Sequence, residues 1–216
     1  MALPFAAGMM EHSLSTFVDL CGTFAFAVSG AIAAEQRRLD LFGVLAISYL
    51  TACGGGFVRD LCLGALPPVA ISDWRYLATA ALAAGMAMWA RPIIEHLSRP
   101  IAFFDALGLG FFAVVGAHKA LLGGQNVEVA ILLGMVTAVG GGVARDVLLN
   151  RVPIILEKEI YAVAALIGAS IQVLGQLMEW SLAATPWLGA FVCLAIRLLA
   201  LRYSWSLPVL RKSDAA

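Results

Sequence analysis

Apolar residues in this chain fall in long runs that short polar connections separate. A helix needs about 20 mostly apolar residues to cross about 30 Å of hydrocarbon. Seven stretches of the 216-residue chain meet this requirement: 14–34, 41–64, 72–90, 101–121, 127–149, 158–178 and 184–202. The pattern predicts an all-α integral membrane protein with seven transmembrane helices, forming a single transmembrane domain over residues 1–216.

Composition supports this prediction and narrows the class of protein. The chain is 62% hydrophobic and 13% charged, whereas soluble domains have about 45–50% apolar and about 25% charged residues. The formal net charge is zero, so no overall basic field attracts nucleic acid, and we expect no nucleic-acid partner. The protein is instead expected to have the lipid bilayer as its surroundings.

Basic residues are distributed unevenly between the two sides of the predicted bundle. If the N-terminus is outside, the opposite side carries nine Lys and Arg residues and the outer side only Arg75 and Lys119. By the positive-inside rule, this predicts a multi-pass protein of the cell (inner) membrane with its N-terminus outside and its C-terminus in the cytoplasm. The nine are Arg37, Arg38, Arg91, Arg99, Arg151, Lys158, Arg202, Arg211 and Lys212.

The chain contains an internal repeat. The segment TACGGGFVRD at 51–60 recurs as TAVGGGVARD at 137–146, a shift of 86 positions. Each unit holds three spans, an odd number, so the second unit enters the membrane from the opposite side. We therefore expect an inverted 3 + 3 repeat, with units at about 14–90 and 101–178, followed by a seventh helix at 184–202. The same shift aligns Asp19 with Asp105, Gly22 with Gly108, Gly30 with Gly116, and Pro67 with Pro153.

Both copies of the repeated segment contain three consecutive glycines. Each glycine costs about 1 kcal/mol of helix propensity relative to alanine. Paired interruptions in the halves of an inverted repeat indicate an ion or substrate site near the midplane. We expect helices two and five to be kinked there, with carbonyls exposed to a permeant cation; the alternative is that the glycines allow close helix packing. The residues are Gly54, Gly55, Gly56, Gly140, Gly141 and Gly142.

An arginine and an aspartate follow each glycine triplet. Adjacent residues point about 100° apart on a helix and do not face each other, so Arg59 and Asp60 are expected to have other partners. The directions of the spans place Asp19 at the depth of Arg59. We expect an Asp19–Arg59 ion pair near the outer mouth, since ionisable groups inside spans are functional candidates, although structural pairing is common.

The repeat predicts the equivalent pair, Asp105–Arg145, near the cytoplasmic mouth. In this arrangement, Asp60 and Asp146 would add negative charge along the path. Four hydroxyls are candidates to complete cation coordination, with bonding to their own backbone carbonyls as the alternative. They are Ser29, Ser48, Thr51 and Thr137.

No motif for catalysis or metal binding is present in the sequence. His12, His96 and His118 are scattered and form no HExxH pattern, and no nucleophile motif occurs. We therefore expect no enzyme activity, no cofactor and no metal beyond a permeant cation, and we include bound lipid among the expected ligands.

Seven spans arranged as 3 + 3 + 1, with GGGxxRD in the second helix of each half, resemble the trimeric intracellular cation (TRIC) channel family. The likeness runs from about Asp19 to Arg202, and two intact motifs are typical of its prokaryotic branch. Animal members instead carry a Lys-Glu motif that binds phosphoinositide, which is absent from residues 54–60. The resemblance implies a homotrimer with one potassium- and sodium-conducting pore inside each protomer, between helices two and five.

The prokaryotic branch is also similar to proteins described as small-amino-acid transporters. The alternative hypothesis is therefore a secondary transporter of a small solute such as glycine. Such a carrier would use Arg59 or Arg145 as the counter-charge of the substrate carboxylate.

Overall fold

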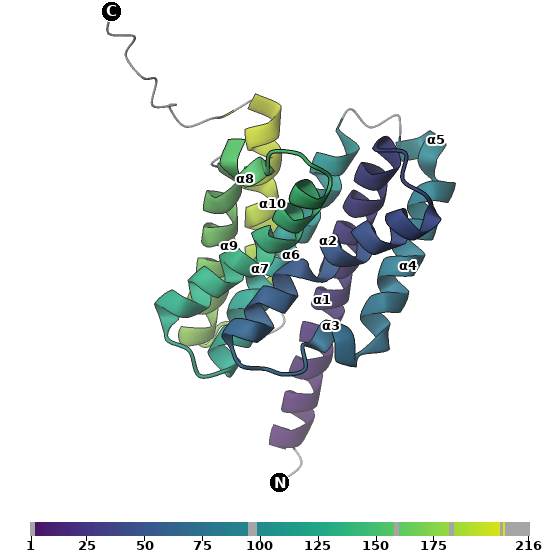
Figure 1. Cartoon of the computed structure of the whole chain (residues 1–216). Helices are drawn as coiled ribbons and strands as arrows, with labels where there is room; N and C mark the ends of the chain where they lie inside the picture. Colours follow the sequence, from purple (N-terminus) through teal and green to yellow (C-terminus); the bar gives the residue numbers. More distant parts are fainter. Residues whose placement is uncertain (1–2, 95–98, 158–159, 182–183, 204, 206–216) are drawn as a thin grey trace, which may run out of the picture.

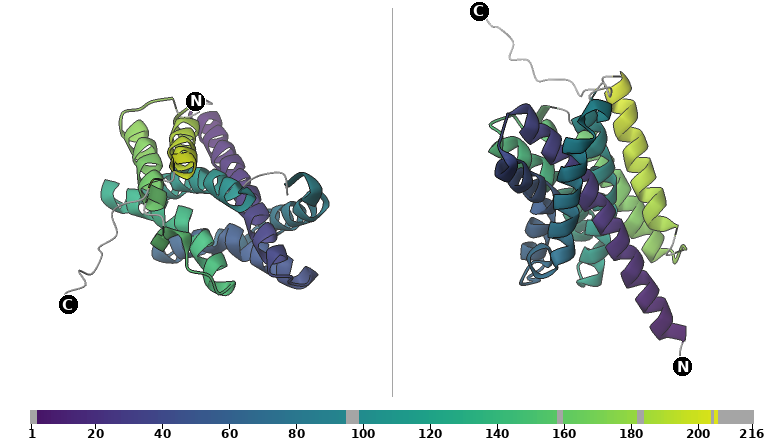
Figure 2. Two further views of the ribbon diagram at one scale, coloured as in Figure 1. Left: turned by 90° about the horizontal axis from the view of Figure 1, so that it is seen from above. Right: turned by 90° about the vertical axis from the view of Figure 1, so that its right-hand side faces the viewer.

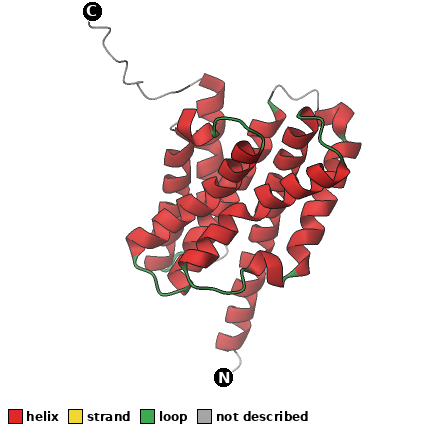
Figure 3. Cartoon of the chain, viewed as in Figure 1, coloured by secondary structure: helices red, strands yellow, loops and turns green. Residues whose placement is uncertain are grey.

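A computed structural model describes residues 3–94, 99–157, 160–181, 184–203 and 205. Within these ranges, every regular element is a helix (Figure 3). Four residues considered above, His96, Lys158, Arg211 and Lys212, lie outside the described residues. The helices are α1 (Leu3–Gln36), α2 (Leu41–Cys62), α3 (Val69–Ser72), α4 (Trp74–Trp89), α5 (Arg91–Ile94), α6 (Pro100–Leu122), α7 (Val127–Leu148), α8 (Ile154–Glu157), α9 (Ile160–Leu177) and α10 (Thr185–Tyr203).

Six of the seven expected spans are helices long and apolar enough to cross a membrane. The exception is α4, whose 16 residues extend over about 24 Å at 1.5 Å per residue. It packs against α1 and α2, between the short helices α3 and α5. The all-helical membrane fold is therefore as expected, whereas helix length does not confirm a count of seven spans.

The long helices alternate in direction through the bundle (Figure 1). Helices α1, α4, α7 and α10 run toward the end drawn at the top of Figure 1, here called the upper end, and α2, α6 and α9 run toward the lower end. The first unit therefore runs up, down, up and the second down, up, down, as an inverted repeat requires. At the lower end, α1 extends beyond the other helices (Figure 2).

The helix ends repeat as well as the helices. The Asp40 side chain caps α2 by accepting the backbone N–H three residues on at 2.8 Å. Asn126, 86 positions later, caps α7 in the same way at 2.9 Å. After these helices, Gly64 and Asn150 occupy equivalent left-handed turns, with φ of 66° and 52°. Local capping thus sets the same helix boundaries in both units.

The two units interlock through their first helices, α1 and α6. The rings of Phe26 and Phe112, equivalent positions in the repeat, pack with centroids 5.2 Å apart. Phe26 lies where a Cβ on Gly108 would be, and Phe112 lies against the equivalent face of Gly22. The contacts are reciprocal, as expected for two units related by an approximate two-fold axis.

Side-chain size differs between the inside and the outside of the bundle. Ala83 and Ala84 are fully buried, whereas Phe42, Leu82 and Phe191 are exposed on the surface. Small residues allow membrane helices to approach closely, and large apolar residues suit contact with lipid tails. The distribution is that of a bundle immersed in hydrocarbon.

Candidate functional site

Helices α2 and α7 cross at their glycine triplets. Both are single helices, Leu41–Cys62 and Val127–Leu148, with helical backbone through all six glycines. Figure 1 shows the two ribbons running obliquely across the bundle, with α2 bending on the way. The expected kink is present in α2 as a bend, whereas the expected interruption of the helical backbone, with carbonyls freed for a cation, is not found. The reason lies in the packing of one helix against the other.

The middle glycine of each triplet faces backbone of the opposite helix. A Cβ added to Gly55 would overlap the carbonyl oxygen of Thr137, and a Cβ added to Gly141 would overlap that of Thr51. Next to this contact, a Cβ on Gly140 would lie 2.8 Å from the Cα of Gly55. The glycines thus permit backbone-to-backbone packing, the alternative considered for the triplets.

Three of the four candidate hydroxyls bond to their own helix. Ser48 donates to the carbonyl of residue 44 at 2.7 Å, and Thr51 and Thr137 donate to carbonyls four residues earlier at 2.6 Å. These three are fully or almost fully buried. Their hydroxyl protons satisfy the backbone rather than pointing into a path. Ser29 differs, because it belongs to a network of charged groups.

That network lies at the upper end of the α2–α7 crossing and is centred on Arg145. Its Nη1 donates to Asp105 Oδ1 at 2.7 Å and to Ser29 Oγ at 2.6 Å, and its Nε donates to Asp146 Oδ1 at 2.9 Å. The side chains of Arg145 and Asp105 are each 1% exposed. Ser29 links the network to the first turn of α6, because its hydroxyl donates to the Ile101 carbonyl at 3.3 Å. The predicted Asp105–Arg145 pair is present.

The equivalent network at the lower end has different partners. Asp19 Oδ2 accepts from Lys119 Nζ and from the Tyr76 hydroxyl, both at 2.5 Å. Arg59 bonds to Asp60, with Nη2 at 2.7 Å and Nε at 2.8 Å from Oδ1. The predicted Asp19–Arg59 pair is therefore wrong. The compact Lys119 ammonium reaches Asp19 and forms the ion pair that the sequence predicted for Arg59.

The two arginines both bond to the aspartate that follows them in sequence. The expectation that neighbours on a helix cannot meet is wrong here, because the long arginine side chain can turn back along the helix surface. The second oxygen of each aspartate accepts a backbone N–H from the next short helix, Val69 to Asp60 at 3.0 Å and Ile154 to Asp146 at 3.1 Å. Asp60 and Asp146 thus fasten chain segments together, rather than standing as spare charge along a path.

Four residues of these networks were not among the sequence candidates. Tyr76 and Tyr161 occupy equivalent positions but are 85 residues apart rather than 86. The first unit has two prolines, Pro67 and Pro68, where the second has one. An alignment of the two units with a one-residue gap would have matched the tyrosines. The other two are Lys119 and Arg197, whose guanidinium carbon lies 4.8 Å from the centre of the Tyr161 ring. Neither cation has an equivalent in the repeat, so no sequence signal identified them.

The two tyrosines provide a matched test of the networks. The Tyr76 hydroxyl donates to Asp19, whereas the Tyr161 hydroxyl lies near Asp105 without a hydrogen bond of normal geometry among the described residues. A hydrogen bond to a charged group contributes about 1.5–3 kcal/mol. We expect Tyr76→Phe to lower the free energy of unfolding by about this amount and Tyr161→Phe to change it by much less, as measured by unfolding in mixed micelles. Equal effects would contradict the assignment.

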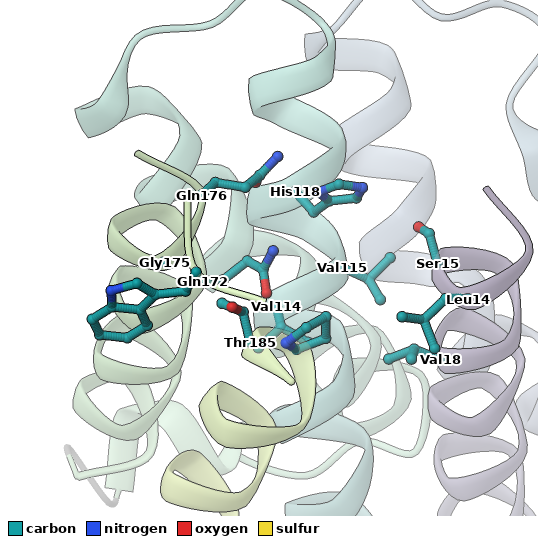
Figure 4. Close-up of a pocket in the computed structure, with 12 residues that line it drawn as sticks. Leu14, Ser15, Val18, Val114, Val115, His118, Gln172, Gly175, Gln176 and Thr185 are labelled. Carbon is teal, nitrogen blue, oxygen red and sulfur yellow. The ribbon is translucent and has the colours of Figure 1, made fainter. Parts of the chain in front are cut away.

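Two cavities flank the lower end of the bundle. One, of about 10 Å³, lies beside Asp19, Arg59 and Tyr76. The other, of about 30 Å³, lies between α1, α6, α9 and α10 (Figure 4). The second has mostly apolar walls, and the buried Gln172 carbonyl oxygen beside it has no hydrogen-bond partner in the described part of the chain. Its volume suits about two water molecules, and it lies outside both charged networks.

Comparison with known proteins matches most of the chain to membrane proteins. The family model described as "Glycine transporter" matches residues 16–92 and 102–176. The UPF0126 membrane protein of Vibrio cholerae is 36% identical over 204 residues, covering 92% of this chain and 84% of its own length. The UPF0126 inner membrane protein YadS of Escherichia coli K12 is 34% identical over 194 residues, covering 89% and 94%. Crystal structures of the TRIC trimeric intracellular cation channel orthologue from Rhodobacter sphaeroides share 31% identity at a TM-score of 0.84, covering 89% of this chain and 100% of that one.

The fold and the two charged networks define an integral membrane protein built on an inverted three-helix repeat. The chain belongs to the family of that model, the bacterial group of TRIC-like membrane proteins. The resemblance carried by the two GGGxxRD motifs is thereby confirmed. The solved relative is an ion channel and not an enzyme, in line with the expectation from the sequence.

Proposed function

We propose that the protein is a channel for monovalent cations, passing potassium and sodium through a pore inside each protomer that α2 and α7 line. The observation that carries this proposal is the pair of equivalent charged networks, one at each end of a single helix crossing. Buried charges are costly in a membrane and usually belong to an ion or substrate pathway. The name of the solved relative, a cation channel, supports the same function.

The proposed path runs from the small cavity beside Asp19 to the network around Asp105. Between them lie the glycine crossing, where Gly55 and Gly141 are buried, and the Phe26–Phe112 pair, which is almost fully buried. This segment is packed without room for an ion, so conduction requires α2 and α7 to separate at the crossing. In this proposal, the contact between the glycines of α2 and α7 closes the pore.

The assembly proposed is a homotrimer, supported by the word "trimeric" in the name of the solved relative. The orientation proposed has the N-terminus outside and the upper end in the cytoplasm, supported by the excess of basic residues on that side. The name of the Escherichia coli relative supports an inner-membrane location. No cofactor is included in the proposal.

Recording from the purified protein in a planar lipid bilayer tests the channel. We expect discrete current steps whose reversal potential follows the potassium gradient, and similar steps in sodium. Protein-free bilayers and the Gly85→Ala variant are the controls, since a Cβ at Gly85 meets nothing within 4 Å. Absence of unitary steps from folded, reconstituted protein would overturn the proposal.

The second candidate function is a secondary transporter of a small solute such as glycine. The family description favours this function. Arg59 favours it as well, because its Nη1 has no hydrogen-bond partner among the described residues and the residue lines the small cavity beside Asp19. A substrate carboxylate would be the matching acceptor. This function predicts saturable counterflow of labelled glycine into liposomes, without current steps.

A further inference from the structure

A larger cavity opens at the upper end of the molecule, away from the α2–α7 crossing. It has a volume of about 270 Å³ and lies between the end of α1, the start of α6, α8 and α10. The polar side chains around it belong to Gln36, Arg99 and Arg197. Neither GGGxxRD motif contributes to its lining.

Arg197 is the unusual member of this set. It is 2% exposed and makes no hydrogen bond to the described part of the chain, and its Nε is enclosed without an acceptor. One face of the guanidinium lies over the Tyr161 ring. An arginine has five N–H donors in a planar fork, and leaving such donors buried and unbonded is unfavourable.

The negative charge nearby does not satisfy these donors. Asp105 offsets the charge of Arg197 at a distance, but Asp105 Oδ1 accepts from Arg145 and forms no ion pair with Arg197. The requirement at this position is therefore for hydrogen-bond acceptors. A ligand rich in oxygen atoms would provide them.

Further positive groups face the same space. The first turn of α6, Pro100 to Ala102, lines the cavity, and no side chain caps this 23-residue helix. The amides at a helix N-terminus, with the helix dipole behind them, attract anions. Arg99 is held at the rim by donating to the Leu201 carbonyl at 3.4 Å.

Two further arginines lie near the cavity, on the connections that follow α1 and α7. Arg151 donates to Gln36 Oε1 at 3.4 Å, and Arg37 donates to the Asn150 carbonyl at 3.3 Å. Burial, together with the neighbouring Arg37, lowers the pKa of Arg151. Of the carboxylates in the described residues here, Glu35 pairs with Arg91 and Asp146 with Arg145, so neither forms an ion pair with Arg37 or Arg151.

We propose that this cavity binds a phosphate group, either the headgroup of an anionic lipid or free phosphate. The phosphate oxygens accept from the forks of Arg197 and Arg99 and from the first turn of α6. The planar guanidinium matches phosphate in a two-bond geometry that lysine cannot reproduce. The site lies outside the α2–α7 crossing, next to the upper network through the contact of Arg197 with Tyr161, and does not depend on what crosses the membrane.

The test uses the delipidated full-length protein and two probes. Native mass spectrometry measures retention of phosphatidic acid against phosphatidylcholine, and thermal unfolding measures the shift in Tm caused by inorganic phosphate against chloride at equal ionic strength. We expect Arg197→Gln and Arg99→Gln each to weaken binding about tenfold, as for loss of a charge-assisted hydrogen bond. Arg75→Gln, at the other end of the molecule, is the matched control.

The outcomes distinguish the two sources of phosphate. Preferential retention of phosphatidic acid that both variants lose identifies the lipid headgroup, and a phosphate-induced Tm shift without lipid preference identifies free phosphate. If Arg197→Gln does not fold, Arg197→Lys, which keeps the charge without the fork, and Arg99→Gln carry the test. Absence of both effects in the wild type, or unchanged binding in Arg99→Gln and Arg197→Lys, overturns the site.

Discussion

Replacing Gly55 with alanine is expected to lower the free energy of unfolding by about 2–3 kcal/mol and to abolish the current. The added Cβ meets the Thr137 carbonyl oxygen, and a backbone atom cannot rotate away as a side chain can. Overpacking typically costs about 1–3 kcal/mol, and more in rigid places, which outweighs the gain of about 1 kcal/mol in helix propensity. Gly141→Ala, the reciprocal change against Thr51, is expected to behave in the same way.

The same triplet contains the control for this experiment. A Cβ at Gly56 has only the flexible Arg59 side chain nearby, at 3.6 Å, so Gly56→Ala is expected to keep the current and to leave stability unchanged or raised by up to about 1 kcal/mol. Unfolding in mixed micelles and bilayer recording measure the two properties. If Gly55→Ala and Gly56→Ala behave alike, the helices do not cross at this glycine.

The second large effect is expected at the upper network. Breaking a buried ion pair by removing one partner costs about 3–5 kcal/mol, and Asp105 and Arg145 are both almost completely buried. A double-mutant cycle with Asp105→Asn and Arg145→Gln should therefore give a coupling energy near the top of the usual range, about 3 kcal/mol. Unfolding free energies of the four proteins supply the measurement.

The lower network provides the comparison cycle. Asp19 bonds to Lys119 and Tyr76 rather than to Arg59, so Asp19→Asn and Arg59→Gln should couple by less than about 1 kcal/mol. Asp19→Asn with Lys119→Met should couple more strongly than that pair. Equal coupling in the Asp105–Arg145 and Asp19–Arg59 cycles would show that the two halves share one pairing scheme, contrary to the structure.

The charged networks show how far the repeat could guide a prediction. A shift of 86 positions correctly related Asp105 to Asp19 and Arg145 to Arg59, because both units form the same helices with the same caps. It identified one ion pair correctly and one wrongly. The difference arises from Lys119, which comes from the other unit and has no repeated counterpart.

The sequence by itself determined the membrane location, the inverted repeat and the positions of the buried charges. These properties follow from hydropathy, helix length and spacing along the chain. The tertiary structure decided whether the glycine triplets interrupt or pack the helices, and which acceptor each cation takes. Both depend on distances between helices, since Gly55 is required by a carbonyl 82 residues away, and an arginine has several acceptors within its reach.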